Sequence, residues 1–156
     1  MYEQILYDVQ DPVAVITFNR PEALNALTAR MQREFKHALA AAESDPSVVG
    51  IVLTGAGRGF CAGADIGGLQ STADGKRGPA EDLSALKASP GDPKMGENFK
   101  VSYTFMLSLK KPIIAAINGP CAGLGFCYAL LCDMRFAEKQ AKFTTAFGQR
   151  GLIAEH

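Results

Sequence analysis

The chain carries the run Gly59-Phe60-Cys61-Ala62-Gly63-Ala64-Asp65-Ile66 shortly after the apolar run Val48-Val49-Gly50-Ile51-Val52-Leu53-Thr54. The apolar run predicts a buried strand, suited to a sheet that is covered on both faces. Small residues where a strand ends let a ligand approach the backbone, so that main-chain N–H groups can act as donors. The same pattern is typical of an ordinary tight turn. Alone, therefore, it indicates a strand exit and leaves its function open.

A second glycine-rich block lies far downstream, over residues 118–126, as Asn118-Gly119-Pro120-Cys121-Ala122-Gly123-Leu124-Gly125-Phe126. It follows a predicted strand and opens a predicted helix. Free N–H groups and the positive dipole end at a helix N-terminus favour a developing negative charge. Two such strand exits converging on one carbonyl would form an oxyanion hole. The alternative is a pair of tight turns that allow close helix–strand packing.

The pattern along the chain alternates strands with helices, which predicts an α/β fold. Apolar residues recur at helical spacing after Thr28, a plausible N-cap, and the helix is expected to end near Glu43. Further helices are predicted over Asn98–Leu109 and Gly123–Leu131. The predicted strands are Ile5–Val9, Val13–Phe18, Val48–Leu53, Ile113–Ile117, Met134–Ala137 and Ala141–Phe143.

The composition is that of one globular domain. The chain has 156 residues, of which 47% are apolar and 21% charged, and its 16 basic and 16 acidic side chains give a net charge of +0. No basic stripe is present, so neither nucleic acid nor an acidic membrane surface is an expected partner. The N-terminal residues lack the pattern of a secretory signal, which predicts a cytoplasmic location with reduced thiols.

Two stretches of the sequence are unusual in composition. Residues 70–97 are rich in glycine and proline and predict a long mobile surface loop, with a helical turn near Glu81–Leu86. Pro112–Cys132 holds no charged residue and is roughly long enough to span a bilayer. Because Asn118-Gly119-Pro120 interrupts it, we expect a strand, a turn and a buried helix instead.

Other chemistries fit the sequence poorly. Gly55-Ala56-Gly57-Arg58-Gly59 lacks the third glycine of a dinucleotide fingerprint, since position 60 is phenylalanine. No nucleophile elbow occurs, His37 is expected to be a solvated helix residue, and His156 is the last residue. Four cysteines without a C-x-x-C pair, and only two histidines, predict no metal site. Cys61 and Cys127 are expected to be buried packing rather than nucleophiles.

Four motifs together carry a family resemblance. They are Asn19-Arg20-Pro21-Glu22-Ala23-Leu24-Asn25-Ala26-Leu27, the run 59–66, Lys111-Pro112-Ile113-Ile114-Ala115-Ala116-Ile117-Asn118-Gly119-Pro120, and Cys132-Asp133-Met134-Arg135. In order and spacing the chain resembles the enoyl-CoA hydratase/isomerase (crotonase) superfamily along almost its whole length. The resemblance implies a single domain over 1–156 with a repeated β-β-α spiral core, truncated before the C-terminal helical region. It also implies a homotrimer or hexamer for the full-length protein.

The resemblance further implies an acyl-CoA substrate whose thioester carbonyl sits in an oxyanion hole, and no metal or redox cofactor. By motif position, the two donors are the backbone N–H groups of Ala64 and Leu124. Leucine replaces the glycine often found at the second position, which is compatible with a backbone donor. Residues implied to bind coenzyme A or substrate are Ala62, Gly63, Ala64, Asp65, Ile66 and Gly123, with Asp65 bracing the loop.

The acid that moves the proton is the point at which the chain departs from hydratases. The two glutamates of that class fall, by counting, on Cys127 and Phe147. The run Gly151-Leu152-Ile153-Ala154-Glu155 matches the register of a later acid found in single-carboxylate isomerases. Glu155 is therefore the expected base and proton shuttle of a double-bond isomerisation. Its other reading is a solvated glutamate at a helix start.

Two other functions stay open at this stage. One is hydration or another acyl-CoA transformation by a different acid, such as Glu81 or Asp82. The other is a truncated chain that binds acyl-CoA, or only assembles, without turnover. The first predicts a water-dependent product from 2-enoyl-CoA that survives loss of Glu155. The second predicts no turnover at all.

Overall fold

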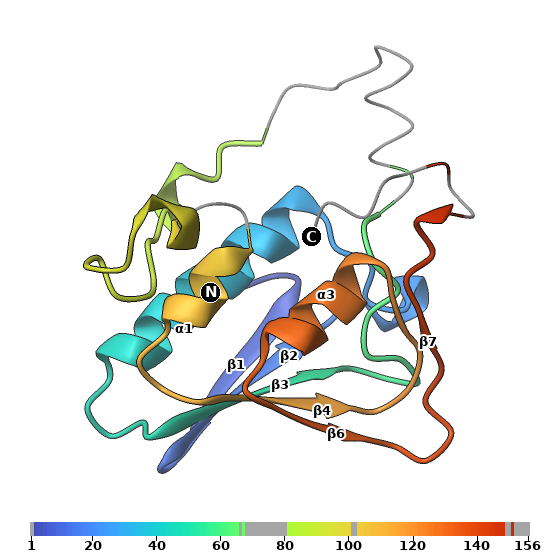
Figure 1. Cartoon of the computed structure of the whole chain (residues 1–156), viewed down its shortest axis with the longest axis horizontal. Helices are drawn as coiled ribbons and strands as arrows, with labels where there is room; N and C mark the ends of the chain where they lie inside the picture. Colours follow the sequence, from blue (N-terminus) through green and yellow to red (C-terminus); the bar gives the residue numbers. More distant parts are fainter. Residues whose placement is uncertain (1, 66, 68–80, 101–102, 149–150, 152–156) are drawn as a thin grey trace.

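The fold has two main layers, a five-stranded sheet with two helices on one of its faces (Figure 1). The computed structural model describes residues 2–65, 67, 81–100, 103–148 and 151. The sheet has the order β1-β2-β3-β4-β6. Its strands are β1 (Ile5–Gln10), β2 (Val13–Phe18), β3 (Gly50–Gly55), β4 (Ile113–Ile117) and β6 (Met134–Ala137). The helices are α1 (Ala29–Ser44) and α3 (Leu124–Leu131).

The topology confirms the predicted α/β class. β1 and β2 form an antiparallel hairpin, and β2, β3, β4 and β6 then run parallel. A second, two-stranded sheet joins β5 (Cys121–Ala122) to β7 (Phe143–Thr144). The order strand, strand, helix therefore occurs twice, as β1-β2-α1 and as β4-β5-α3. This is the repeated β-β-α arrangement that the sequence motifs imply.

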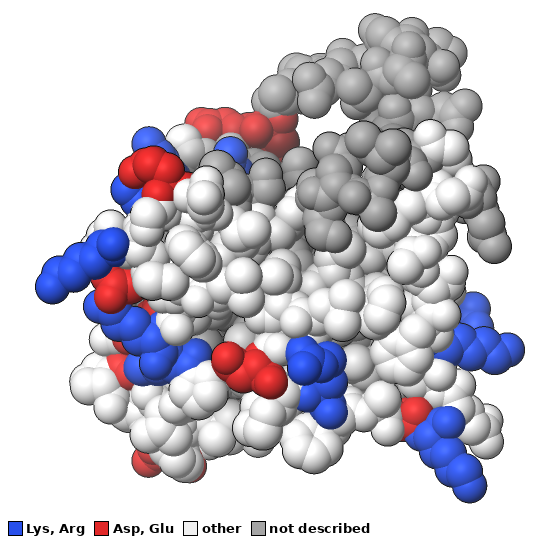
Figure 2. Space-filling model, in the orientation of Figure 1, with Lys and Arg blue, Asp and Glu red and all other residues white. Residues whose placement is uncertain are grey.

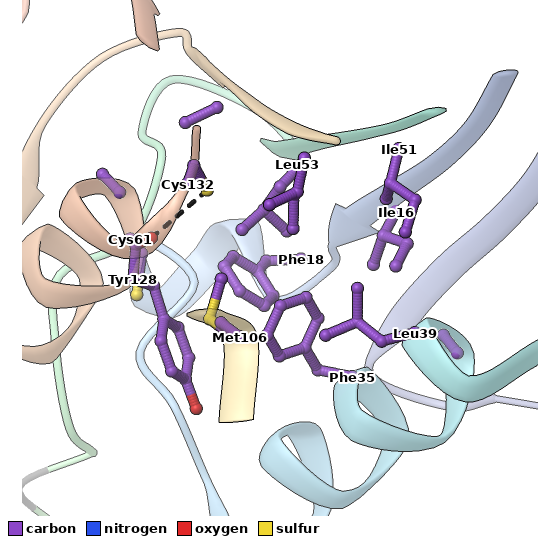
Figure 3. Close-up of a cluster of buried hydrophobic side chains, with 14 of the residues drawn as sticks. Ile16, Phe18, Phe35, Leu39, Ile51, Leu53, Cys61, Met106, Tyr128 and Cys132 are labelled. Atoms are coloured by element: carbon purple, nitrogen blue, oxygen red, sulfur yellow. Dashed lines mark hydrogen bonds between the residues drawn. The ribbon is translucent and has the colours of Figure 1, made fainter. Parts of the chain in front are cut away.

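The core lies between the sheet and the two helices. Alternate residues of β2, β3 and β4 are buried, because successive side chains of a strand point to opposite faces. Figure 3 shows how Phe18 and Phe35 fill the space between the strands and α1, with Tyr128 of α3 beside them. The ring centroids of Phe18 and Phe35 are 5.4 Å apart, and those of Phe35 and Tyr128 are 5.2 Å apart. The helices are thus anchored to the sheet through aromatic contacts.

Helix α1 begins where its sequence predicts. Thr28 is the N-cap, and its Oγ1 accepts a hydrogen bond from the backbone N–H of Met31 at 3.0 Å. Glu34 is fully buried on this helix, yet its carboxylate accepts from the backbone N–H groups of Glu3 and Gln4 at 2.9 and 2.8 Å. A buried carboxylate is tolerated when it is hydrogen-bonded in this way. The helix is therefore tied to the chain just before β1.

One predicted helix is wrong in type. Where Asn98–Leu109 was expected to be α-helical, the described residues form two short 3₁₀ segments, Glu97–Phe99 and Thr104–Ser108. The hydroxyl of Thr104 donates to the carbonyl of Asn98, a side-chain bond that competes with helical backbone pairing. The carbonyl of Ser108 accepts instead from the backbone N–H of Asp92 at 2.8 Å. Tertiary contacts therefore override the helical periodicity here.

Other expectations need smaller corrections. The strand after 48 starts at Gly50, and only one of its faces is fully buried, because α1 and α3 lie on one side of the sheet. His37 is half-buried rather than solvated, and its Nδ1 lies 2.7 Å from the hydroxyl of Tyr2. In the predicted loop, residues 81–97 include a 3₁₀ turn at Ser84–Leu86, while 70–80 lie outside the described residues.

The uncharged stretch 112–132 folds as expected into strand, turn and helix, namely β4, β5 and α3. In the part of the chain that the structure describes, no helix combines the length and the apolar character needed to cross a membrane. Figure 2 shows basic and acidic side chains interspersed around the rim of one face, with an uncharged centre. Neither sign of charge forms a continuous field on this face.

Candidate functional site

The two small-residue stretches lie against each other because they leave neighbouring parallel strands. β3 and β4 pair in parallel, with Ile51 opposite Ile113, so their carboxyl ends meet at the same edge of the sheet. Beyond that edge, Cys61 and Cys121 form an isolated parallel bridge. The backbone N–H of Ala122 donates to the carbonyl of Cys61 at 2.9 Å. The topology therefore brings together two segments that are 60 residues apart in the sequence.

Glycines allow this close approach. A Cβ at Gly125 would lie 2.6 Å from both the Cβ and the carbonyl oxygen of Cys61. A Cβ at Gly119 would lie 2.1 Å from the carbonyl oxygen of Arg58. Contacts this short are not seen for real Cβ atoms, so neither position accepts a side chain without a local shift. Close packing of the backbone explains these two glycines. This is what the alternative interpretation, a pair of tight turns, predicts.

Two asparagines fix the turn between β3 and the run 59–66. The Nδ2 of Asn118 donates to the carbonyls of Gly55 and Gly57 at 2.8 and 2.9 Å. The Nδ2 of Asn25, which is fully buried, donates to the carbonyls of Ala56 and Gly59 at 2.9 and 2.8 Å. Asn118 and Asn25 therefore hold the turn from both sides. Both asparagines lie within the family motifs, but the motifs alone do not predict this role.

Ala64, the first expected donor, is held by the segment just before α1. Leu27 pairs with it: the N–H of Leu27 donates to Gly63 at 2.7 Å, and the N–H of Asp65 donates to Leu27 at 3.0 Å. This pairing uses the carbonyl of Gly63 and the N–H of Asp65, the residues on either side of Ala64. Within the described ranges 2–65, 81–100 and 103–148, the Ala64 N–H itself donates no hydrogen bond. The donor expected from the motif is thus positioned but unused by these parts of the chain.

Leu124, the second expected donor, is the first residue of α3. Gly123 precedes it with a φ of +49°, and no side chain caps the helix. The N–H of Gly123 is used, since it donates to the carbonyl of Thr144 at 3.0 Å. Among the residues described by the structure, the Leu124 N–H has no acceptor. An uncapped first turn leaves donors at the positive end of the helix dipole.

The two expected donors belong to loops in contact. A Cβ at Gly63 would lie 3.4 Å from the nitrogen of Leu124 and 3.0 Å from the carbonyl oxygen of Ala122. Gly63 also has a φ of +99°, which side chains other than glycine rarely adopt. A glycine is therefore required here for both conformation and space. The next residue is Ala64, so the structure places both predicted donors around the same contact.

The remaining predicted site residues have different positions. Ala62 is exposed on the same run, and Asp65 accepts a hydrogen bond from Arg20 Nη1 at 2.8 Å, consistent with a bracing role. Arg20 also donates to the carbonyl of Ala26 at 2.6 Å, so this pair ties the run to the segment before α1. Ile66 and Glu155 lie outside the described residues.

The two glutamates of hydratases align with Cys127 and Phe147, and both of these residues lie in apolar surroundings. Cys127 is buried in the first turns of α3, and Phe147 is half-buried and packs against the core. Burial raises the pKa of the Cys127 thiol, so it stays protonated at neutral pH. Neither position can therefore supply a carboxylate to a bound molecule. Of the open alternatives, Glu81 forms an ion pair with Arg30 of α1.

The cysteines behave as packing residues. All four are free and buried. Burial raises the pKa of Cys61, Cys121 and Cys132 to about 12 in each case, which keeps these thiols protonated and unreactive at neutral pH. Among the described residues, no group of three or more histidine, cysteine or acidic side chains is arranged to hold a metal ion.

The fold and the paired strand exits define a class of α/β proteins with two glycine-rich loops in contact, and comparison with known proteins identifies the family. Residues 8–156 match the model of the enoyl-CoA hydratase/isomerase family. The chain belongs to this family. A probable enoyl-CoA hydratase, echA14, from Mycobacterium tuberculosis is 39% identical over 97% of this chain and 53% of its own length. The 1,2-epoxyphenylacetyl-CoA isomerase of Escherichia coli is 37% identical over 99% of this chain and 55% of its own.

Solved structures agree with this assignment. An enoyl-CoA hydratase/isomerase from Mycobacterium paratuberculosis superposes with a TM-score of 0.73 at 33% identity, covering 99% of this chain and 53% of the other. An enoyl-CoA hydratase, EchA12_1, from Mycobacterium marinum is 41% identical with a TM-score of 0.68, covering 97% of this chain and 59% of the other. The chain thus spans about half the length of the relatives it matches.

Proposed function

We propose that the full protein is an acyl-CoA enzyme that stabilises a thioester enolate with the backbone N–H groups of Ala64 and Leu124. The observation that carries the proposal is the contact between Gly63 and the Leu124 nitrogen, with both N–H groups unused by the described chain. Enolate formation places negative charge on the thioester oxygen. A preorganised donor at such an oxygen contributes about 3–4 kcal/mol to lowering the barrier.

The reaction we propose is a 1,3-proton transfer in a 3-enoyl-CoA, with Glu155 as the shuttle. Its carboxylate takes a proton from C2, and the electron pair moves onto the thioester oxygen. When the enolate collapses, the double bond moves from C3–C4 to C2–C3 and C4 takes the proton back from Glu155. Atoms and electrons balance, and no metal or redox cofactor takes part in this sequence. The absence of an acid at Cys127 and Phe147 favours this single-carboxylate scheme.

Hydration is the second candidate, and the printed names of several relatives favour it. EchA14 and other similar proteins carry the name enoyl-CoA hydratase, whereas one is named an isomerase. In this chain a hydratase would need an acid other than the two positions counted for that class. A water-dependent product from 2-enoyl-CoA would support it. A full protein that binds acyl-CoA without turnover is the third reading.

The test uses the full-length protein with a 3-enoyl-CoA substrate. We expect Glu155→Gln to lower kcat at least about 100-fold, because a positioned acid–base group contributes about 10²–10⁴-fold. Glu138→Gln removes an exposed carboxylate on the segment after β6 and serves as the matched control, with kcat unchanged. Unchanged turnover in Glu155→Gln would remove the shuttle role. Hydration of 2-enoyl-CoA that survives this change would favour the second candidate.

We also propose that the full protein forms a homotrimer or hexamer and that it is located in the cytoplasm. Both come from the family resemblance and the thiol content rather than from a contact in this chain. The mass of the full protein in solution, measured by light scattering, tests the assembly. A monomer at micromolar concentration would contradict it.

A further inference from the structure

A cavity of about 340 Å³ lies between α1, the segment around Tyr103 and α3. Its lining residues are Ala29, Gln32, Arg33, Lys36, Tyr103, Phe105 and Tyr128. Tyr128 contributes to the core with its ring, and Figure 3 shows its hydroxyl pointing away from the aliphatic side chains of the sheet. Tyr103 packs edge-on against this ring, with centroids 5.4 Å apart. The cavity therefore combines aromatic walls with polar and cationic groups.

One residue of the cavity wall, Tyr128, lies on the helix that begins with the proposed donor. Tyr128 follows Leu124 by four residues, which is about one turn or 5.4 Å along a helix. Tyr103 packs against the ring of Tyr128, so the cavity wall continues from α3 onto the segment around Tyr103. The cavity wall and the proposed donor therefore share helix α3, through Tyr128 and Leu124. The occupant expected there is the distal part of an acyl group, which rests on the proposed function.

The charged side chains that line the cavity, Arg33 and Lys36, are both basic. Lys36 is half-buried, with its Nζ 4.7 Å from the centre of the Phe105 ring, and Arg33, which is exposed at the mouth of the cavity, lies one turn before it on α1. None of the ion pairs within 2–65, 81–100 and 103–148 includes either side chain. Asp92 lines an adjoining cavity that Lys36 also lines, but its ion pair is with Lys110, at 4.0 Å.

Arg30, on the same helix, is a cation whose charge is balanced by nearby carboxylates. Its guanidinium forms ion pairs with Glu3 and Glu34, at 3.0 and 3.3 Å, and with Glu81. By contrast, burial and then the charge of Arg33 lower the pKa of Lys36. Both effects disfavour the ammonium ion as the chain stands. A bound anion in the cavity would reverse them.

We propose that this cavity receives the distal end of the acyl group, and that Lys36 and Arg33 select thioesters whose acyl chain ends in a carboxylate. The aromatic walls contact the methylene chain, and the two cations meet the carboxylate at its end. Charge-assisted hydrogen bonds from lysine and arginine to a carboxylate are about twice as strong as neutral ones. The substrate class is therefore an enoyl-CoA derived from a dicarboxylic acid.

The test compares two ligands that differ only at the distal end, adipoyl-CoA and hexanoyl-CoA, binding to the full-length protein by calorimetry. We expect the wild type to bind adipoyl-CoA about tenfold more tightly, and Lys36→Met to remove this preference. Lys36→Arg keeps the charge and should keep the preference. Lys94→Met, an exposed lysine that lines neither cavity, is the matched control and should also keep it.

The outcomes separate this inference from the proposed function. Equal affinity of the wild type for both ligands would overturn the distal carboxylate while leaving acyl-CoA binding in place. An equal loss for both ligands in Lys36→Met would overturn it too, because the lysine would then be meeting a phosphate of coenzyme A. If neither ligand binds, the proposed function fails, and this inference fails with it.

Discussion

Helices α1 and α3 lie on the same face of the sheet, but their first turns are completed in different ways. At α1, Thr28 caps the N–H of Met31 with its side chain. At α3, Gly123 has no side chain to offer, and the Leu124 N–H has no acceptor among the described residues. A capped helix start satisfies its own donors, whereas an open one leaves them for a ligand. The comparison separates a structural helix start from a candidate binding one.

The two helix starts also differ in how they meet the rest of the chain. The first turn of α1 is tied down by charge, through the ion pairs of Arg30. The first turn of α3 is packed directly against backbone, because Gly125 lies against Cys61 and Gly63 against Leu124. Backbone contact of this kind positions the donors rigidly without using them. Rigid donors are what electrostatic stabilisation of an oxyanion needs.

The largest expected effect comes from breaking the packing at α3. Gly125→Val should lower the free energy of unfolding by about 3 kcal/mol, because its Cβ would lie 2.6 Å from the Cβ and carbonyl oxygen of Cys61. Urea denaturation followed by circular dichroism measures the change. Gly148→Ala is the control, since a Cβ there meets no described atom within 4 Å. Equal stability of the two variants would contradict the packing argument.

An intermediate effect is expected at Gly63, which supports the same helix start from the other loop. Gly63→Ala should cost about 2 kcal/mol of stability, since its φ of +99° is strained for alanine and its Cβ would lie 3.0 Å from the carbonyl of Ala122. Gly96→Ala, at a φ of −59° with no described atom near its Cβ, should change stability little. The midpoints of denaturant unfolding of both variants test this prediction. An unchanged midpoint in Gly63→Ala would contradict the requirement for glycine at position 63.

The smallest effect is expected at the capped helix. Thr28→Ala removes the acceptor for the Met31 N–H and should lower the free energy of unfolding by about 1 kcal/mol. Thr28→Ser keeps the oxygen and should lose much less. Because α1 begins outside the proposed oxyanion hole, acyl-CoA affinity should follow stability only. If Thr28→Ala lowered acyl-CoA affinity by more than it lowered stability, the start of α1 would also contribute to binding, and the proposed difference between the two helix starts would be wrong.

Local chemistry explains which elements could be predicted. The alternation in Val13–Phe18 and the Thr28 cap both act over a few residues, so they appear in the sequence and hold in the structure. The segment 98–109 was predicted as α-helix and is not, because Ser108 and Asn98 bond elsewhere. Strands β5 and β7 are only two residues long and pair with each other, with partner residues 22 positions apart in the sequence, so β5 carried no signal of its own.

For the candidate site, the sequence indicated which stretches end in small residues but not how they meet. The roles of Asn25 and Asn118 depend on carbonyls far from each in the sequence, at Gly59 and Gly55, and so were not predicted. Lys36 and Arg33 have the spacing of an ordinary helix face, and only the structure places Tyr103 and Tyr128 beside them in the wall of one cavity. Such groupings arise from long-range packing, which no local pattern encodes.

The sequence by itself determined the α/β class, the family motifs and the positions of glycine, because each depends on residue type and spacing alone. The tertiary structure decided what those glycines do. Parallel pairing of β3 and β4 carries their two exits to one edge of the sheet, where Gly63 and Gly125 admit backbone contact. Only there do the loops of Ala64 and Leu124 touch, through Gly63, and the N–H groups of these two residues are unused by the part of the chain that the structure describes.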